Sequence, residues 1–145
     1  MGATPEIVQD LPGISVEVLP WSEDREVDFI RQIDVGIMPL IDGPWEKGKC
    51  GYKLIQYMAS SVPVVASPVG VNTEIVGGSQ CGLLADSSVD WEASLRELLG
   101  SADQRLRYGS AGRVAVENKY TLHVQVLALR KVFSEVVAQN KASGL

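Results

Sequence analysis

Residues 51–70, GYKLIQYMASSVPVVASPVG, combine a helical pattern with an uninterrupted apolar run, and this combination decides the fold class. In the first half, the spacing of Leu54, Tyr57 and Met58 predicts a helix over residues 52–60 with one buried face. In the second half, residues 62–67 are apolar without the alternation that marks a half-exposed strand. Such a run is typical of a parallel strand covered by helices on both faces. The stretch therefore predicts a helix packed on a parallel sheet.

The segments on either side repeat this order of strand and helix. The run DVGIMPL, residues 34–40, is a second candidate for a buried parallel strand. A short helix over residues 72–76 is expected to lead, through Gly77-Gly78, to a brief strand at residues 82–84. Strand and helix alternate until about residue 100, which predicts an α/β fold with a Rossmann-like three-layer α/β/α arrangement and a mostly parallel sheet. A helical C-terminal tail follows, in three segments over residues 90–99, 102–118 and 122–139.

The N-terminal part predicts one more strand and one more helix. Residues 14–19 alternate, with Ile14, Val16 and Val18 on one side, which indicates a half-exposed strand at a sheet edge. Ser22 is placed to cap the following helix. We expect that helix to bury a stripe formed by Val27, Ile30 and Ile33.

The last two helices of the tail have distinct expected roles. Arg113 is expected to form a structural ion pair rather than touch a substrate. The final helix has apolar residues at spacings of three and four, which predicts one continuous apolar face. These residues are Leu122, Val126, Leu129, Phe133 and Val136.

Length, charge and cysteine content limit the function classes. A chain of 145 residues with 46% hydrophobic residues is about one domain, so residues 1–145 are expected to form a single domain. A net charge of −5 argues against nucleic acid as a partner. Cys50 and Cys81 have neither C-x-x-C spacing nor a histidine nearby, and we expect neither a metal ion nor a cofactor. The expected location is the cytoplasm, and a peripheral position at the inner membrane surface stays open.

Residues 43–50, GPWEKGKC, match the phosphate-binding loop of nucleotide triphosphatases at every position except the last. Cys50 stands where that loop has a serine or threonine, whose hard oxygen binds Mg²⁺ and which a thiol replaces poorly. The triphosphatase is therefore a weak alternative. A solvated loop in which Lys47 and Lys49 merely point outward is a second interpretation.

Gly51 and Lys53 support a third interpretation of the loop. Gly51 allows the backbone to approach a ligand closely. Lys53 lies in the first turn of a helix, where the helix dipole makes a cation unfavourable. A bound diphosphate would supply the missing negative charge.

From residue 34 onward, the chain resembles the C-terminal domain of group 1 (family 4) glycosyltransferases, which are retaining enzymes with two Rossmann-like halves (the GT-B fold). The resemblance rests on DVGIMPL, on GYKLIQYMASSVPVVASPVG, on Glu74 in NTEIV, on QCGLLAD, and on RLRYGSAGRVAVENKYT, which contains a Gly-x-x-Gly-Arg. It implies that this chain is the donor-binding portion of an enzyme that transfers a glycosyl group from a nucleotide-diphosphate sugar. It also implies that residues 1–145 form a single, incomplete nucleotide-sugar-binding domain and that the chain alone is inactive.

The resemblance implies a set of site residues. The family has two glutamates eight residues apart, the first near the transferred sugar and the second on the nucleotide ribose. Gly48 stands at the first position here and Gln56 at the second, where an amide can still bond to ribose hydroxyls. Glu46 and Glu74 are candidates for contacts to the sugar or for orienting the donor. The donor diphosphate is expected over Gly48, Lys49, Gly51, Tyr52 and Lys53.

The resemblance also implies missing partners. In the family an acceptor-binding domain and the first strands of the donor domain precede the part matched here. Without those strands, residues 34–38 would form an unpaired sheet edge, which invites pairing. We expect either that residues 14–19 pair beside residues 34–38 in a rearranged sheet, or that a homodimer forms through the exposed edge. The competing function is a non-catalytic binding or assembly module that keeps the fold, and a nucleotide-sugar epimerase is a weaker third.

Overall fold

The computed structural model describes residues 6, 11 and 13–142 and forms an α/β fold around a parallel sheet of three strands. The strands are β1 (Gly36–Met38), β2 (Val64–Ala66) and β3 (Gly82–Leu84), in the spatial order β1-β2-β3. Gly36 pairs with Val64 and Val64 pairs with Gly82, so the strands lie in register. Because the strands are parallel, their carboxyl ends meet at one edge of the sheet. The predicted fold class is confirmed.

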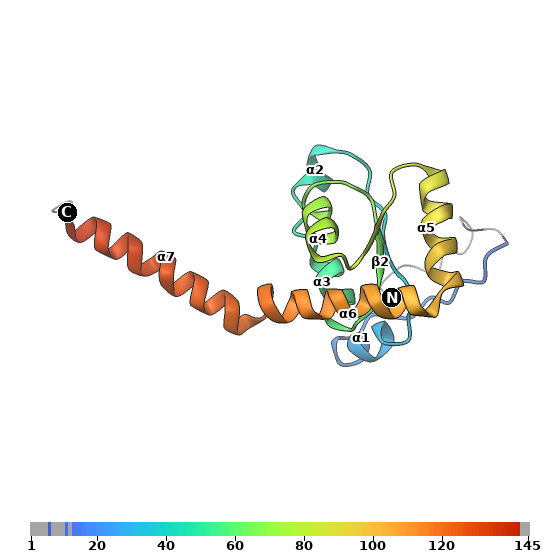
Figure 1. The fold of residues 1–145 in the computed structure, drawn as a ribbon, viewed down its shortest axis with the longest axis horizontal. Coiled ribbons are helices and arrows are strands. Elements are labelled where there is room, and N and C mark those ends of the chain that lie inside the picture. The colour runs from blue at the N-terminus through green and yellow to red at the C-terminus, as the bar shows by residue number, and fades with distance from the viewer. Residues whose placement is uncertain (1–5, 7–10, 12, 143–145) are drawn as a thin grey trace.

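One face of the sheet is covered by α3 (Tyr52–Ala59), α4 (Val71–Ser79) and the C-terminal part of α6 (Ala102–Lys119). Leu54 and Met58 of α3 are completely buried there against Val64 of β2. In Figure 1, α3 and α4 lie on one side of β2 and α5 lies on the other. The predicted helix over residues 52–60 and its buried face are confirmed.

The other face is covered by α5 (Ser88–Gly100) and the N-terminal part of α6. Leu98 of α5 packs against Val65 and Ala85 in this layer. The helix begins with a capping box, in which the Ser87 hydroxyl accepts from the N–H of Asp90 and the Asp90 carboxylate accepts from the N–H of Ser87. Bonds to Ser87 lower the pKa of the Asp90 carboxyl. Both layers therefore have defined helices, as the three-layer prediction requires.

Helix α6 crosses both layers and approaches them closely through two glycines. A Cβ on Gly109 would overlap the carbonyl oxygen of Ser61, and one on Gly112 would lie 3.1 Å from the Cβ of Cys81. Next to this contact, Nη1 of Arg113 donates to the carbonyl oxygen of Ala59 at 2.6 Å, and Nε bonds to Glu117 at 2.7 Å. The predicted structural role of Arg113 is confirmed, and the Gly-x-x-Gly-Arg pattern has a packing explanation.

The N-terminal prediction is partly wrong. Residues 14–19 form no strand, and β1 pairs only with β2 within the described chain, so the rearranged sheet does not form. Of the alternating side chains, Ile14 is 63% exposed, whereas Val16 and Val18 are half-buried. Alternation alone supplies no hydrogen-bonding partner for a strand. The homodimer alternative concerns a second chain and remains a prediction.

The next helix, α1 (Glu23–Ile30), forms where it was expected, but its buried stripe is narrower than predicted. Ile30 is buried and Ile33 is half-buried, whereas Val27 is 50% exposed. The Ser22 side chain makes no capping hydrogen bond. The structure also extends α4 beyond its predicted end, because Gly77 and Gly78 continue the helix, and a Cβ on either would contact nothing within 4 Å.

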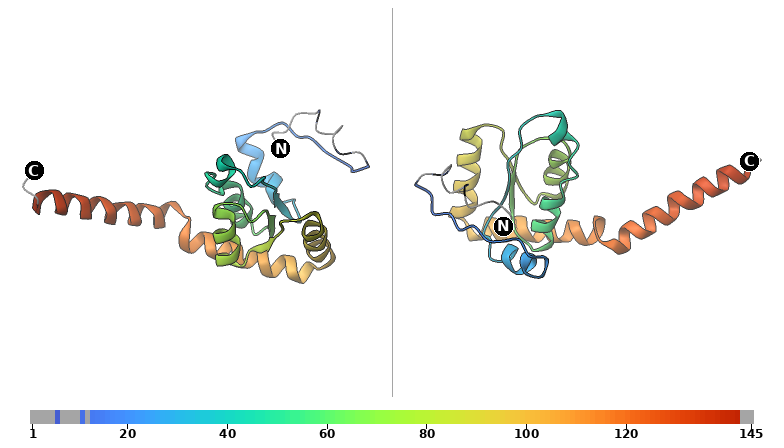
Figure 2. Two further views of the ribbon diagram at one scale, coloured as in Figure 1. Left: turned by 90° about the horizontal axis from the view of Figure 1, so that it is seen from above. Right: turned by 180° about the vertical axis from the view of Figure 1, so that it is seen from behind.

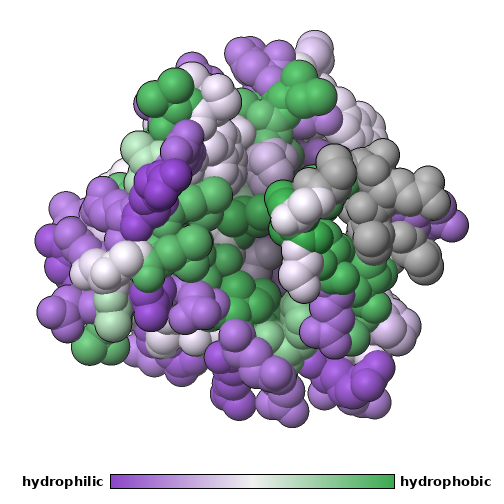
Figure 3. Space-filling view, turned by 90° about the vertical axis from the view of Figure 1, so that its right-hand side faces the viewer, coloured by the Kyte–Doolittle hydropathy of each residue, from purple (hydrophilic) through white to green (hydrophobic). Residues whose placement is uncertain are grey.

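The last helix, α7 (Leu122–Ala142), projects away from the rest of the molecule (Figures 1 and 2). The predicted apolar residues are all exposed, from 81% at Leu122 to 43% at Val126. Figure 3 views the opposite end of the molecule, where apolar side chains gather around a hollow within a hydrophilic rim. The predicted apolar face is therefore present in sequence but covers no part of the body.

Candidate functional site

The loop from β1 to α3 lies at the carboxyl edge of the sheet, where open α/β sheets bind ligands. It contains the short helix α2 (Pro44–Lys47) and ends at Gly51, the N-cap of α3. Gly51 has φ +68°, a left-handed conformation that favours glycine. The predicted glycine loop thus leads directly into a helix N-terminus.

The loop is packed against the N-terminus of α4. A Cβ on Gly51 would lie 2.5 Å from Cδ1 of Ile75, and one on Gly70, at φ +56°, would lie 2.8 Å from the carbonyl oxygen of Lys47. The two glycines therefore hold the loops after β1 and β2 in direct contact. Ser67 adds a bond between them, because its hydroxyl accepts from the N–H of Leu40 at 3.0 Å.

The N-terminus of α3 is electrostatically open to an anion. No side chain caps it, and its first turn contains no acidic residue. The first N–H groups of a helix have no partner within the helix, and the helix dipole adds partial positive charge at the same end. The N-terminus of α4 also lacks a side-chain cap, although Glu74 lies in its first turn. Free N–H groups next to Gly51 are suited to bind phosphate oxygens.

The three lysines of the loop region differ in their partners. Nζ of Lys47 lies 2.9 Å from Oδ1 of Asp42, and Nζ of Lys49 lies 3.9 Å from Oε1 of Glu46. Lys53 forms no ion pair with any residue in the part of the chain that the structure describes. The uncompensated cation thus lies in the first turn of α3, where the sequence pattern also placed it.

Gln56, the candidate for ribose, lies on α3 and is bonded to α1. Its Nε2 donates to Oε2 of Glu26 at 2.7 Å, and Oε1 of the same carboxylate accepts from Nε1 of Trp21 at 3.2 Å. Lys53, Gln56 and Glu26 line one small hollow of about 50 Å³. Sequence reasoning did not identify Glu26, because nothing in a single sequence indicates which carboxylate meets a residue 30 positions away.

Gly48 and Tyr52 lie in the loop region as expected, and Cys50 between them is exposed. Gly48 ends α2 with φ −81°, and a Cβ there would make only an ordinary contact, 3.5 Å from the carbonyl oxygen of Trp45. The backbone therefore does not require glycine at this position. Pro44, Trp45, Gly48 and Lys49 line an open hollow of about 220 Å³.

Glu74 does not join the loop residues in any contact that the structure records. It is exposed on α4, and the interaction shown is with Tyr120, whose pKa is raised by burial and, to a lesser extent, by the charge of Glu74. An orienting role for Glu74 toward the donor has no support from this geometry.

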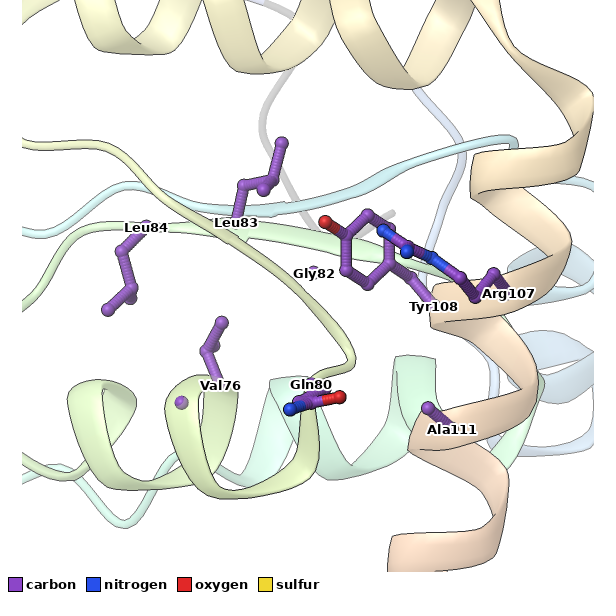
Figure 4. A pocket seen from close by; sticks show the side chains of 9 residues that line it. Val76, Gln80, Gly82, Leu83, Leu84, Arg107, Tyr108 and Ala111 are labelled. Carbon is purple, nitrogen blue, oxygen red and sulfur yellow. The ribbon is translucent and has the colours of Figure 1, made fainter.

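A larger hollow, of about 420 Å³, lies at the outer edge of β3 between α4 and α6 (Figure 4). Its lining is mostly apolar, and the guanidinium of Arg107 stacks over the ring of Tyr108 at 4.6 Å from the centroid. None of the loop residues discussed above lines this hollow. No single sequence pattern predicts this hollow, since its lining combines residues 76–84 with residues 107–111.

The described residues contain no group of three His, Cys, Asp or Glu side chains placed to hold a metal ion. No helix among them has both the length and the apolar character to cross a bilayer.

Comparison with protein families gives one match. The model described as "Glycosyl transferases group 1" matches residues 2–101, which is more than half of the chain. Neither the search of curated proteins nor the search of solved structures found a match.

Proposed function

The chain belongs to the group 1 glycosyltransferases, and from this membership we propose that it binds the nucleoside-diphosphate-sugar donor of a glycosyl transfer reaction. Family membership supports glycosyl transfer in general. The donor-binding role is supported by the loop between β1 and α3, which lies at the carboxyl edge of the parallel sheet.

The observation that carries the proposal is the N-terminus of α3. It combines a left-handed Gly51, the lack of a side-chain cap and a Lys53 cation that has no ion-pair partner among the described residues. A cation is unfavourable at a helix N-terminus, and a diphosphate would both accept from the free N–H groups and balance the charge of Lys53. In this proposal the diphosphate lies over the segment from Gly48 to Lys53.

The chemistry assigned to this chain is electrostatic. In glycosyl transfer, the bond between the anomeric carbon and the diphosphate oxygen breaks, and an acceptor oxygen bonds to that carbon. Lys53 and the α3 N-terminus stabilise the negative charge that builds on the departing diphosphate. We assign no nucleophile or general base to this chain. Retention of anomeric configuration is part of the proposal and follows the family resemblance.

A non-catalytic binding or assembly module is the second candidate. It is favoured by Gly48 and Gln56, which stand where the family has carboxylates. The outer side of β1 has no partner strand among the described residues, which gives such a module a surface for a second copy. The two candidates differ in whether a nucleotide binds to the loop.

The test is calorimetric titration of the chain with UDP, GDP, ADP and their sugar conjugates. Wild type is expected to bind one nucleotide family, and Lys53→Ala is expected to weaken binding about tenfold or more, since a charge-assisted bond contributes roughly 1.5–3 kcal/mol. Lys47→Ala is the matched control, because Lys47 is exposed and already paired with Asp42.

Three outcomes are informative. A loss of nucleotide affinity in Lys53→Ala, with wild-type affinity in Lys47→Ala, supports the donor site. An equal loss of nucleotide affinity in the two lysine variants would indicate a general charge effect instead of a site at α3. Absence of binding by wild type at millimolar nucleotide would overturn the donor-binding proposal and favour the assembly module.

A further inference from the structure

Glu26, on α1, has both carboxylate oxygens engaged by N–H donors. Oε2 accepts from Gln56 at 2.7 Å, and Oε1 accepts from Trp21 at 3.2 Å. The Glu26–Gln56 bond is partly buried and joins α1 to α3. Such a charge-assisted bond is shorter and stronger than one between neutral groups.

This bond fixes which end of the Gln56 amide is free. An ionised carboxylate can only accept hydrogen bonds, so Gln56 must present its NH₂ group to Glu26. Its carbonyl oxygen is therefore directed away from Glu26. A glutamine without such a partner can exchange its oxygen and nitrogen by rotation, and each orientation offers a ligand different chemistry.

Gln56 lies one helical turn after Lys53, and both line the same hollow on the α1 side of α3. A cation and a fixed acceptor thus follow each other along one face of the helix. In a nucleoside diphosphate, a ribose with hydroxyl donors is joined directly to the diphosphate. The order of the two side chains along α3 therefore matches the order of the two groups in the ligand.

We propose that Glu26 is a positioning residue, which holds Gln56 so that its amide oxygen accepts a hydrogen bond from a ribose hydroxyl of the donor nucleotide. The inference rests on the proposed donor-binding function. The negative charge of Glu26 polarises the Gln56 amide and makes its oxygen a better acceptor. The Gln56 amide oxygen then accepts a hydrogen bond from the ribose as a carboxylate oxygen would, without an added charge.

The test compares the affinity of each protein for UDP, GDP and ADP with its affinity for their 2′-deoxy and 3′-deoxy forms. Wild type is expected to prefer one ribonucleotide over a deoxy form about fivefold or more, which is what one hydrogen bond contributes. Glu26→Gln keeps the size of the side chain but removes the obligatory acceptor. We expect this preference to disappear while affinity for the deoxy form stays within about twofold, as the diphosphate contacts remain.

Two further variants distinguish an effect on the orientation of the Gln56 amide from a general structural effect of Glu26. In Glu26→Gln with Gln56→Glu, the amide and the carboxylate exchange places, and the ribose preference is expected to return. Glu23→Gln, on the exposed side of the same helix, should leave the preference unchanged. Thermal unfolding of every variant checks that each protein is folded at the temperature of the titration.

The outcomes distinguish this inference from the function on which it rests. If wild type binds none of the nucleotides, both the proposed donor-binding function and the proposed role of Glu26 are wrong. If wild type prefers the ribonucleotide and Glu26→Gln retains that preference, donor binding stands and the positioning role is overturned. A wild type that binds ribo and deoxy forms equally also overturns the positioning role.

Discussion

Cys81 and Cys50 show how strongly the surroundings of a residue control its chemistry. Cys81 is completely buried next to α6, and burial raises the pKa of its thiol to about 11. Cys50 is exposed in the loop before α3. The protonated thiol of Cys81 is therefore favoured in the folded state, and the free energy of unfolding depends on pH wherever the unfolded thiol ionises first.

We predict that the folded state loses stability between about pH 9 and pH 11. The folded pKa lies above the unfolded value, so the stabilisation is complete below the unfolded pKa and is lost as pH rises through the folded pKa. A difference of about two pKa units corresponds to roughly 2–3 kcal/mol. Thermal unfolding of Cys81→Ala from pH 8 to pH 11 should show a weaker pH dependence than wild type.

Cys50→Ala is the control for that series and should keep the wild-type pH dependence. Burial also raises the pKa of Tyr57 and Tyr120. Part of the loss of stability at alkaline pH should therefore remain in Cys81→Ala. If the stability of Cys81→Ala falls with pH as steeply as that of wild type, the buried thiol does not cause the loss of stability at alkaline pH.

Single residues at the candidate site differ in how far the sequence could identify them. Lys53 was identified because a cation in the first turn of a helix conflicts with the helix dipole, and that conflict is local in sequence. The fixed orientation of Gln56 was not, because it depends on Glu26 in a different helix. Glu74 is a candidate only by resemblance; its charge contributes to the raised pKa of Tyr120, and its role toward the donor stays a prediction.

At the scale of elements, the position of α6 depends on its two glycines. Gly109 faces the carbonyl oxygen of Ser61 so closely that no side-chain carbon fits, and Gly112 meets Cys81. The close approach also lets Arg113 reach the carbonyl at the end of α3. A helix without these glycines would have to move away from the sheet and would lose several buried contacts.

We predict that Gly109→Ala lowers the free energy of unfolding by about 2–3 kcal/mol, because the new methyl group displaces α6 from Ser61. Chemical denaturation followed by circular dichroism measures the change. Gly77→Ala is the matched control, since Gly77 is also helical but has open space around its Cβ position.

The control should behave in the opposite way. Alanine is the better helix former, so Gly77→Ala should raise the free energy of unfolding by up to about 1 kcal/mol. Equal effects in the two variants would mean that helix propensity, and not the close approach of α6, determines the result.

Three elements that the sequence located correctly lie in the core or beside it, where an apolar pattern has a surface to cover; they are residues 52–60, 62–67 and 82–84. The final helix, expected over residues 122–139, also forms, although its apolar side chains are exposed. Residues 14–19 have the right alternation for a strand but no neighbour to pair with. A periodic pattern states which face of a segment is apolar, and long-range packing determines whether anything meets that face.

At the scale of the whole molecule, α7 is separate from the body. The side chains that form its apolar face are exposed, and the helix points away from the sheet in all three ribbon views (Figures 1 and 2). The core clusters contain residues from the sheet and from α3 to α6, and the last residue packed against them is Tyr120.

We therefore predict that a chain ending at residue 121 has a thermal midpoint within a few degrees of the full chain. Differential scanning calorimetry of both proteins measures this directly. A chain ending at residue 114, which removes Ala115 and Val116 from the core, is the comparison and should fail to fold cooperatively. A large loss of stability in the chain ending at residue 121 would show that α7 contributes to the body.

The packing of Gly51 and Gly70 has a consequence for binding energetics. Gly51 lies against Val71 and Ile75 of α4, and Gly70 lies against the backbone of Lys47, so the segments at this edge are packed together before a ligand binds. A ligand that binds there restricts the protein little further. The entropic cost of binding is therefore smaller than it would be for a flexible loop, and the affinity is correspondingly higher. Association should then be a single fast step, without the slow conformational phase of a closing lid.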